Sequence, residues 1–221
     1  MERRGPVSAL TYLLEMGAGW LPWMAVNLAL AAVPAGLALV LFRRSRRVTP
    51  LWWAGVVAFV LFLPNAPYVL TSYRWLVGPW RNAWQHDRWR FATILPLWAL
   101  YFAAGFVLFV VSVRWAQQFV GRRWSPTIGR VTVVALTLAS AVGLYLGRAD
   151  LFSWSVITEP DEVVGVVRRV GTGAGAPGIA LAFVVLLAGY AVAIAAFERF
   201  GRGRGPQPSR RDPATPSPRA G

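Results

Sequence analysis

Residue types that carry much of protein chemistry are missing or nearly missing from this chain of 221 residues. Cysteine is absent, which excludes disulfides, thiolate nucleophiles and metal sites with cysteine ligands. Lysine is also absent, which excludes Schiff-base chemistry. His86 is the single histidine, so one chain cannot form a site with several histidine ligands. We therefore expect no bound metal and no cofactor.

Charge is scarce as well. Charged residues make up 14% of the chain, whereas they make up about 25% of an average soluble domain. Apolar residues make up 56%, against about 45–50% in soluble domains. The mean hydropathy is +0.48. Too little polar surface remains to cover a water-soluble globule, so the chain faces lipid. This excludes a cytosolic enzyme and a disordered protein.

The cationic side chains are 23 arginines, and the net charge is +14. Such a charge also occurs in proteins that bind nucleic acid. In a membrane protein, loop arginines set the topology and contact anionic lipid, which is the simpler explanation. The expected partners are membrane lipids, and the alternative is another membrane protein. We do not expect the chain to bind nucleic acid.

Five apolar stretches are long enough to cross a hydrocarbon core, which takes about 20 residues. They are Pro22–Phe42, Leu51–Leu70, Ala92–Val113, Val131–Gly147 and Pro177–Phe197. The sequence therefore predicts an all-α polytopic membrane protein of about five transmembrane helices with short interfacial helices. Residues 1–200 form one domain in this interpretation, and residues 201–221 form a disordered basic cytoplasmic tail.

Two further segments are predicted to lie at the membrane surface. Met1–Gly19 is expected to be a retained interfacial segment, because Glu15 interrupts its apolar run and no cleavage pattern follows. Glu159–Val170 is expected to be a short surface-lying helix.

The arginines fall between the stretches and at the chain ends. Fourteen lie in the first loop, the third loop and the tail, and nine lie in the N-terminal segment and the other two loops. Positively charged loops stay in the cytoplasm, so this distribution predicts an outer N-terminus and a cytoplasmic C-terminus.

The fourth stretch, the shortest, carries small residues at every fourth position, namely Ala135, Ala139, Gly143 and Gly147. Small residues on one face let helix backbones approach closely. We expect this helix to be the packing centre of the bundle. A dimer interface is the alternative.

Two prolines interrupt the second stretch. Proline has no N–H, so Pro64 and Pro67 leave the carbonyls of Val60 and Leu63 without their helical donors. Lipid cannot replace those donors, so protein or water must. One interpretation is a structural kink in which Asn65 bonds locally. The other is a functional site, since irregular backbone at membrane depth usually lines protein or a cavity.

A second polar motif follows the fourth stretch. The second and fourth stretches cross in the same direction, so both motifs lie toward the outer face. The predicted binding site consists of Asn65, Tyr68, Arg148, Asp150, Ser153 and Trp154, beside the kink at Pro64 and Pro67. One hypothesis places Arg148 against this kink, where it donates to the freed carbonyls. The alternatives are pairing with Asp150, binding of an anionic headgroup, and an arginine that reaches the interface from a helix end.

The run Leu63–Tyr68 (Leu-Pro-Asn-Ala-Pro-Tyr), followed later by Leu-Gly-Arg and Ser-Trp, resembles a bacterial family of multi-pass membrane proteins. That family is known as domain of unknown function 1361. The resemblance covers about Asn27–Pro160 and implies a bacterial plasma membrane, with no activity to inherit. It also implies acidic residues at two positions where this chain has Ser72 and Ser155.

Three functions fit a membrane protein of this kind. We favour a binding protein with a polar site at the outer face that takes a lipid headgroup or a membrane partner. The alternative is a membrane-embedded enzyme that acts on a lipid-linked substrate there, using His86, Asp87 or Asp150. Transport is least favoured, because the predicted stretches contain no Asp, Glu, Lys or His and show no internal repeat.

Overall fold

The structure is a computed structural model, and it describes residues 6–45, 48–73, 88–148, 173 and 175–202. The regular elements in these ranges are helices, and no strand occurs among the described residues. The elements are α1 (Pro6–Ala38), the π-helix η1 (Leu39–Arg44), α2 (Pro50–Phe62), α3 (Asn65–Thr71), α5 (Arg88–Arg123), α6 (Pro126–Arg148) and α8 (Ala176–Arg202). The all-α prediction is confirmed.

Among the described residues, five helical segments are long and apolar enough to cross a membrane, as the sequence predicts. They are Trp20–Arg44, Pro50–Thr71, Leu95–Arg123, Pro126–Gly147 and Ala176–Phe200. The predicted lead-in segment is helical from Pro6 and continuous with the first of them. The predicted surface helix Glu159–Val170 lies outside the described residues. So does the predicted tail, apart from the last two residues of α8.

The third and fourth segments are longer than the sequence predicts. Helix α5 continues ten residues past the expected end at Val113, and α6 begins at Pro126 rather than at Val131. A cap explains the earlier start, because Ser125 Oγ accepts from the Ile128 N–H at 3.2 Å and proline suits the first helical position. The fourth segment, at 22 residues, is not short.

The first segment ends in a widened turn that the second segment supports. The Ser45 N–H donates to the Val40 carbonyl at 2.9 Å, which closes a turn of π-helix. The Trp52 indole N–H donates to the Leu41 carbonyl at 3.1 Å. Trp52 is buried, so this tryptophan joins the first two segments.

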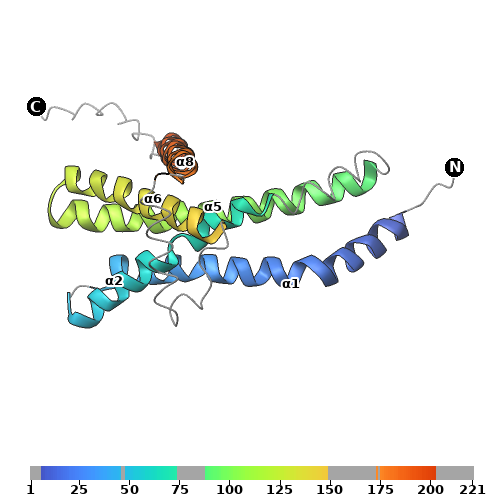
Figure 1. The fold of residues 1–221 in the computed structure, drawn as a ribbon, viewed down its shortest axis with the longest axis horizontal. Helices are drawn as coiled ribbons and strands as arrows, with labels where there is room; N and C mark the ends of the chain where they lie inside the picture. The colour runs from blue at the N-terminus through green and yellow to red at the C-terminus, as the bar shows by residue number, and fades with distance from the viewer. Residues whose placement is uncertain (1–5, 46–47, 74–87, 149–172, 174, 203–221) are drawn as a thin grey trace, which may run out of the picture.

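Helix α5 is the centre of the bundle. It packs against α1, α3 and α6, and α1 and α5 run side by side along the long axis in Figure 1. The expectation that the fourth helix would be the packing centre is wrong. Only part of its small-residue stripe is used, because Ala135 is exposed while Gly143 and Gly147 contact α3.

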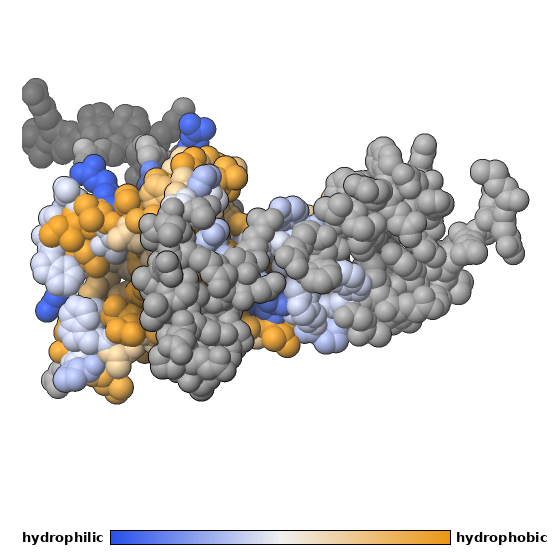
Figure 2. Space-filling model, viewed as in Figure 1, coloured by the Kyte–Doolittle hydropathy of each residue, from blue (hydrophilic) through white to orange (hydrophobic). Residues whose placement is uncertain are grey.

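Helix α8 packs on α6 at the edge of the bundle. It is seen nearly end-on in Figure 1, where the other long helices run across the view, so it crosses them steeply. Figure 2 shows hydrophobic surface over much of the part drawn in colour. Large apolar side chains such as Leu100, Leu181 and Val192 are exposed. This is the surface that a lipid-facing bundle requires.

Candidate functional site

The break in the second segment is repaired mostly by the chain itself. Leu63 and Pro64 form a turn between α2 and α3. The Ala66 N–H donates to the Leu63 carbonyl at 3.2 Å, and the Tyr68 N–H donates to the Pro64 carbonyl at 3.0 Å. The Leu63 carbonyl therefore needs no donor from another helix, contrary to the expectation from the sequence. A tighter turn supplies one locally.

Asn65 also bonds locally. Its Nδ2 donates to the Phe62 carbonyl at 3.1 Å, across the break. The Thr71 hydroxyl closes the other end of α3 by donating to the Tyr68 carbonyl at 2.7 Å. This hydrogen bond supports the interpretation that Asn65 has a structural role at the kink.

Two glycines of α6 bring that helix against α3. A Cβ atom at Gly143 would collide with the ring of Pro64, and one at Gly147 would lie 3.4 Å from the ring of Tyr68. The two polar motifs of the sequence are therefore neighbours along their backbones, since α6 ends at Arg148, one residue after Gly147. Arg148 is described only as the last residue of this helix. Asp150, Ser153 and Trp154 lie outside the described residues, as do His86 and Asp87.

Helix α5 supplies a side chain that sequence reasoning missed. Tyr101 is only 3% exposed, and Ser72, at the end of α3, lies beside its hydroxyl. The two groups do not meet hydrogen-bond geometry, and the Tyr101 hydroxyl has no hydrogen-bond partner among the described residues. A buried hydroxyl without a partner costs about 1–3 kcal/mol. The site thus contains a polar group that a ligand or water would satisfy.

Aromatic rings hold Tyr101 in place. Its ring centre lies 5.8 Å from that of Trp98 and 6.2 Å from that of Trp23. The Trp20 and Trp98 rings are 5.7 Å apart and pack edge to face. Trp98 is buried. These tryptophans join α1 to α5, and they orient the hydroxyl toward the end of α3.

The arrangement could have been anticipated in part from Gly105. A Cβ atom there would lie 2.6 Å from the Cβ of Val69 and 2.9 Å from the Ala66 carbonyl oxygen. Gly105 lets α5 run against α3, and Tyr101 lies one helical turn before it. The signal in the sequence is a glycine four residues after a tyrosine in a predicted membrane helix. It indicates that another helix packs close to the turn that carries the tyrosine.

A protein-family model matches residues 26–190, and its description is Protein of unknown function (DUF1361). The chain belongs to the DUF1361 family. No curated protein and no solved structure matches it. The match extends beyond the resemblance seen in the sequence and includes the first half of α8.

Three described side chains of this DUF1361 protein bring hydrogen-bonding groups to the end of α3. Tyr68 and Tyr101 offer two phenols and Ser72 an aliphatic hydroxyl, all of which donate and accept hydrogen bonds. No group of three or more metal-ligating side chains occurs among the described residues. What the described part can do is hold a polar group at the end of α3.

Proposed function

We propose that this DUF1361 protein, whose five apolar helices make it a multi-pass membrane protein, binds the polar headgroup of a lipid at the α3 end of the bundle. We place it in a bacterial plasma membrane with this end outside. The proposal assigns Tyr68, Ser72 and Tyr101 to the inner wall of the site. The predicted residues Arg148, Asp150, Ser153 and Trp154 would complete it.

The observation that carries the proposal is the buried Tyr101 hydroxyl. It lies beside Ser72 and lacks a hydrogen-bond partner among the described residues. The contact between Gly147 and Tyr68 supports it, because Arg148 follows Gly147 directly. A headgroup that carries both a charge and hydrogen-bonding oxygens would use the Tyr101 hydroxyl together with an arginine from the end of α6.

The charge distribution supports the proposed orientation. The other end of the bundle carries several described arginines on η1, α5 and α6, and positively charged ends face the cytoplasm. Reporter fusions after Phe200 test this. We expect activity from reporters that work in the cytoplasm. Activity only from periplasmic reporters would reverse the orientation and move the proposed site to the cytoplasmic face.

Two matched variants test the site itself. Tyr101→Phe and Thr137→Val each remove one buried hydroxyl that has no partner among the described residues. Native mass spectrometry of the purified protein with its co-purifying lipids should show a lipid adduct that Tyr101→Phe weakens and Thr137→Val leaves intact. If both variants keep the adduct, Tyr101 does not contact the ligand. A protein adduct in place of a lipid would favour a membrane partner.

The enzyme alternative rests on His86, Asp87 and Asp150, which lie outside the described residues. One histidine beside one aspartate in sequence rarely suffices as a catalytic base. We therefore expect His86→Ala to leave lipid binding unchanged. An activity on a lipid-linked substrate that His86→Ala abolishes, in a protein that still inserts, would favour the enzyme.

A further inference from the structure

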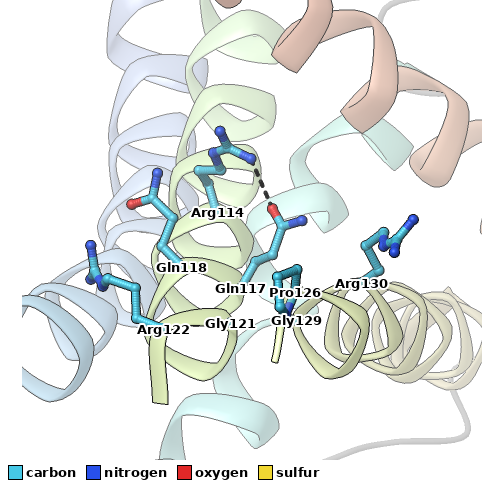
Figure 3. A pocket seen from close by; sticks show the side chains of 8 residues that line it. All are labelled: Arg114, Gln117, Gln118, Gly121, Arg122, Pro126, Gly129 and Arg130. Carbon is cyan, nitrogen blue, oxygen red and sulfur yellow. Dashed lines mark hydrogen bonds between the residues drawn. The ribbon is translucent and has the colours of Figure 1, made fainter. Parts of the chain in front are cut away.

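The end of the bundle opposite the α3 site contains a pocket of about 480 Å³ where α5 and α6 meet. Its size falls within the range of small-molecule sites, about 300–1,000 Å³. Figure 3 shows Arg114 in its middle, Gln118 and Arg122 to the left, and Arg130 to the right. None of these residues belongs to the proposed headgroup site, so the pocket is a separate candidate site.

Glycines form the floor of this pocket and keep it open. A Cβ atom at Gly129 would lie 3.0 Å from the Gln117 carbonyl oxygen and 3.1 Å from the Cα of Gly121. The two helices therefore cross with backbone against backbone. Because neither glycine has a side chain, no side chain from the crossing point fills the space above it.

Arg114 is held in position by Gln117, which a tyrosine of helix α8 contacts. Its Nη1 donates to Gln117 Oε1 at 3.0 Å, and its Nη2 lies 3.7 Å from Glu198 Oε1. The Tyr190 hydroxyl donates to the same Gln117 oxygen at 2.6 Å. The Arg114 side chain is 31% exposed. The guanidinium is thus fixed before any ligand arrives, which lowers the entropy cost of binding.

The other two arginines have few partners in the described part of the chain. Arg122 is exposed and makes no hydrogen bond or ion pair there. Arg130 has one long hydrogen bond, from Nη2 to Thr127 Oγ1 at 3.4 Å. No acidic side chain is among the described residues that line the pocket. The pocket therefore has three guanidinium groups, and Glu198 is the one carboxylate that the described ion pairs place near any of them, which leaves positive charge for an anion.

The start of α6 adds to this field. The helix begins at Pro126, on the wall of the pocket, and a helix start carries a partial positive charge.

Two arginines near the pocket lie on tryptophan rings and are not part of its lining. Arg43 lies over the ring of Trp115 at 5.5 Å, and Arg123 lies over that of Trp124 at 5.9 Å. Neither of them lines the pocket.

The place of the pocket identifies the kind of anion. Two membrane-crossing segments, Leu95–Arg123 and Pro126–Gly147, end or begin there, so the pocket lies where lipid phosphates lie. Trp124, Ile128 and Val131 are exposed apolar side chains within two residues of pocket residues in the sequence. They suit an acyl chain attached to the anion and give no advantage to free phosphate. Basic pockets between membrane helices are known to take anionic headgroups.

We propose that the pocket of Arg114, Arg122 and Arg130 binds the phosphate of an anionic phospholipid, with the acyl chains along the adjacent apolar surface of the α5–α6 hairpin. Arg114 is the fixed contact. Arg122 and Arg130 close on the phosphate from its two sides.

The test compares two double variants that remove equal charge from the same end of the full chain. Arg122→Gln with Arg130→Gln removes the pocket cations, and Arg43→Gln with Arg123→Gln removes two that do not line it. Binding of phosphatidylglycerol and cardiolipin would be titrated by native mass spectrometry, with phosphatidylcholine as the zwitterionic reference.

We expect the pocket variant to weaken binding of the anionic lipids about tenfold or more relative to the control variant, because charge-assisted hydrogen bonds are lost. Phosphatidylcholine binding should not change. Equal losses in both double variants would mean that general surface charge binds the lipid, which would overturn the proposal.

Two further arms separate the remaining outcomes. Inorganic phosphate at millimolar concentration should not displace the lipid, and displacement would assign the pocket to a free anion. If the pocket variant unfolds, Arg122→Lys and Arg130→Lys keep the charge but lose the forked geometry. We then expect intermediate lipid affinity, and wild-type affinity in these lysine variants would contradict the proposed contacts.

Discussion

The two ends of this bundle form polar sites in different ways. At the α3 end, the backbone is irregular, with a proline break and local hydrogen bonds, and the buried polar group beside it is a neutral tyrosine hydroxyl. At the α5–α6 end, the backbone is regular helix and the side chains are charged. Glycine permits close packing at both ends. The comparison teaches that an irregular helix and a charged pocket are separate means of making a polar site in an apolar protein.

The largest expected effect is on packing at the α3 end. Gly143→Ala places a Cβ against the ring of Pro64, and a proline ring cannot rotate out of the way. We expect a loss of about 3 kcal/mol in unfolding free energy, the upper end of the cost of overpacking. Thermal unfolding in detergent measures it.

Gly36→Ala is the matched control for that substitution, since a Cβ at Gly36 meets nothing within 4 Å. It should leave stability unchanged or raise it by up to about 1 kcal/mol through helix propensity. Equal losses for both alanines would show that α6 does not lie against Pro64.

Arg148→Ala comes next. The hypothesis that this arginine lies against Pro64–Tyr68 now concerns the Val60 carbonyl, which Pro64 leaves without its helical donor. It predicts a loss of about 1–3 kcal/mol, the cost of leaving a buried acceptor without its donor. Arg148→Lys should recover only part of it, because a compact ammonium does not reproduce the planar donor geometry of a guanidinium. Wild-type stability of Arg148→Ala would place the side chain in lipid headgroups or water instead.

Two tyrosines sharpen the comparison further. Tyr190→Phe removes the hydroxyl that donates to Gln117, so we expect a loss of about 1 kcal/mol. Tyr101→Phe removes a hydroxyl without a partner among the described residues, so in lipid-free detergent it should raise the unfolding free energy by about 1 kcal/mol, the lower end of the cost of such a group. Added lipid should then stabilise the wild type more than Tyr101→Phe. The same lipid-induced shift in both proteins would count against a ligand at Tyr101.

The smallest effect belongs to Glu198→Gln. Its carboxylate lies 3.7 Å from Arg114 and is 45% exposed. An exposed ion pair contributes less than about 1 kcal/mol, so stability should barely change. Binding of anionic lipid should tighten, because the carboxylate that opposes the pocket charge is gone. Weaker binding would show that Glu198 is needed to position Arg114.

The sequence was sufficient for the parts of the fold that composition controls. Five segments of about 20 apolar residues, and a break at Pro64 and Pro67, follow from hydropathy and from the missing proline N–H. The ends of the third and fourth segments were missed, because polar residues such as Arg114 and Gln117 are typical of loops. In the structure, Arg114 and Gln117 lie on one helical face with Gly121. Ser125–Pro126 is a helix start that the sequence also shows.

The candidate site was harder to predict from the sequence than the fold was. Proximity of α6 to the kink was foreseen from small residues, and Gly143 and Gly147 make that contact. The donor for the Leu63 carbonyl was not foreseen, because a tighter local turn competes with a distant arginine and needs no chain closure. Tyr101 and the arginine pocket depend on which helices neighbour α5, and hydropathy carries no such information.

The most direct test of two separate polar sites is native mass spectrometry of one protein preparation with each site removed in turn. The two-site account predicts that Arg122→Gln with Arg130→Gln loses the anionic phospholipid adduct and keeps the adduct at the α3 end. Tyr101→Phe should show the reverse. Loss of the same adduct in both variants would contradict the account, because a single lipid or a general loss of folding would then explain both ends.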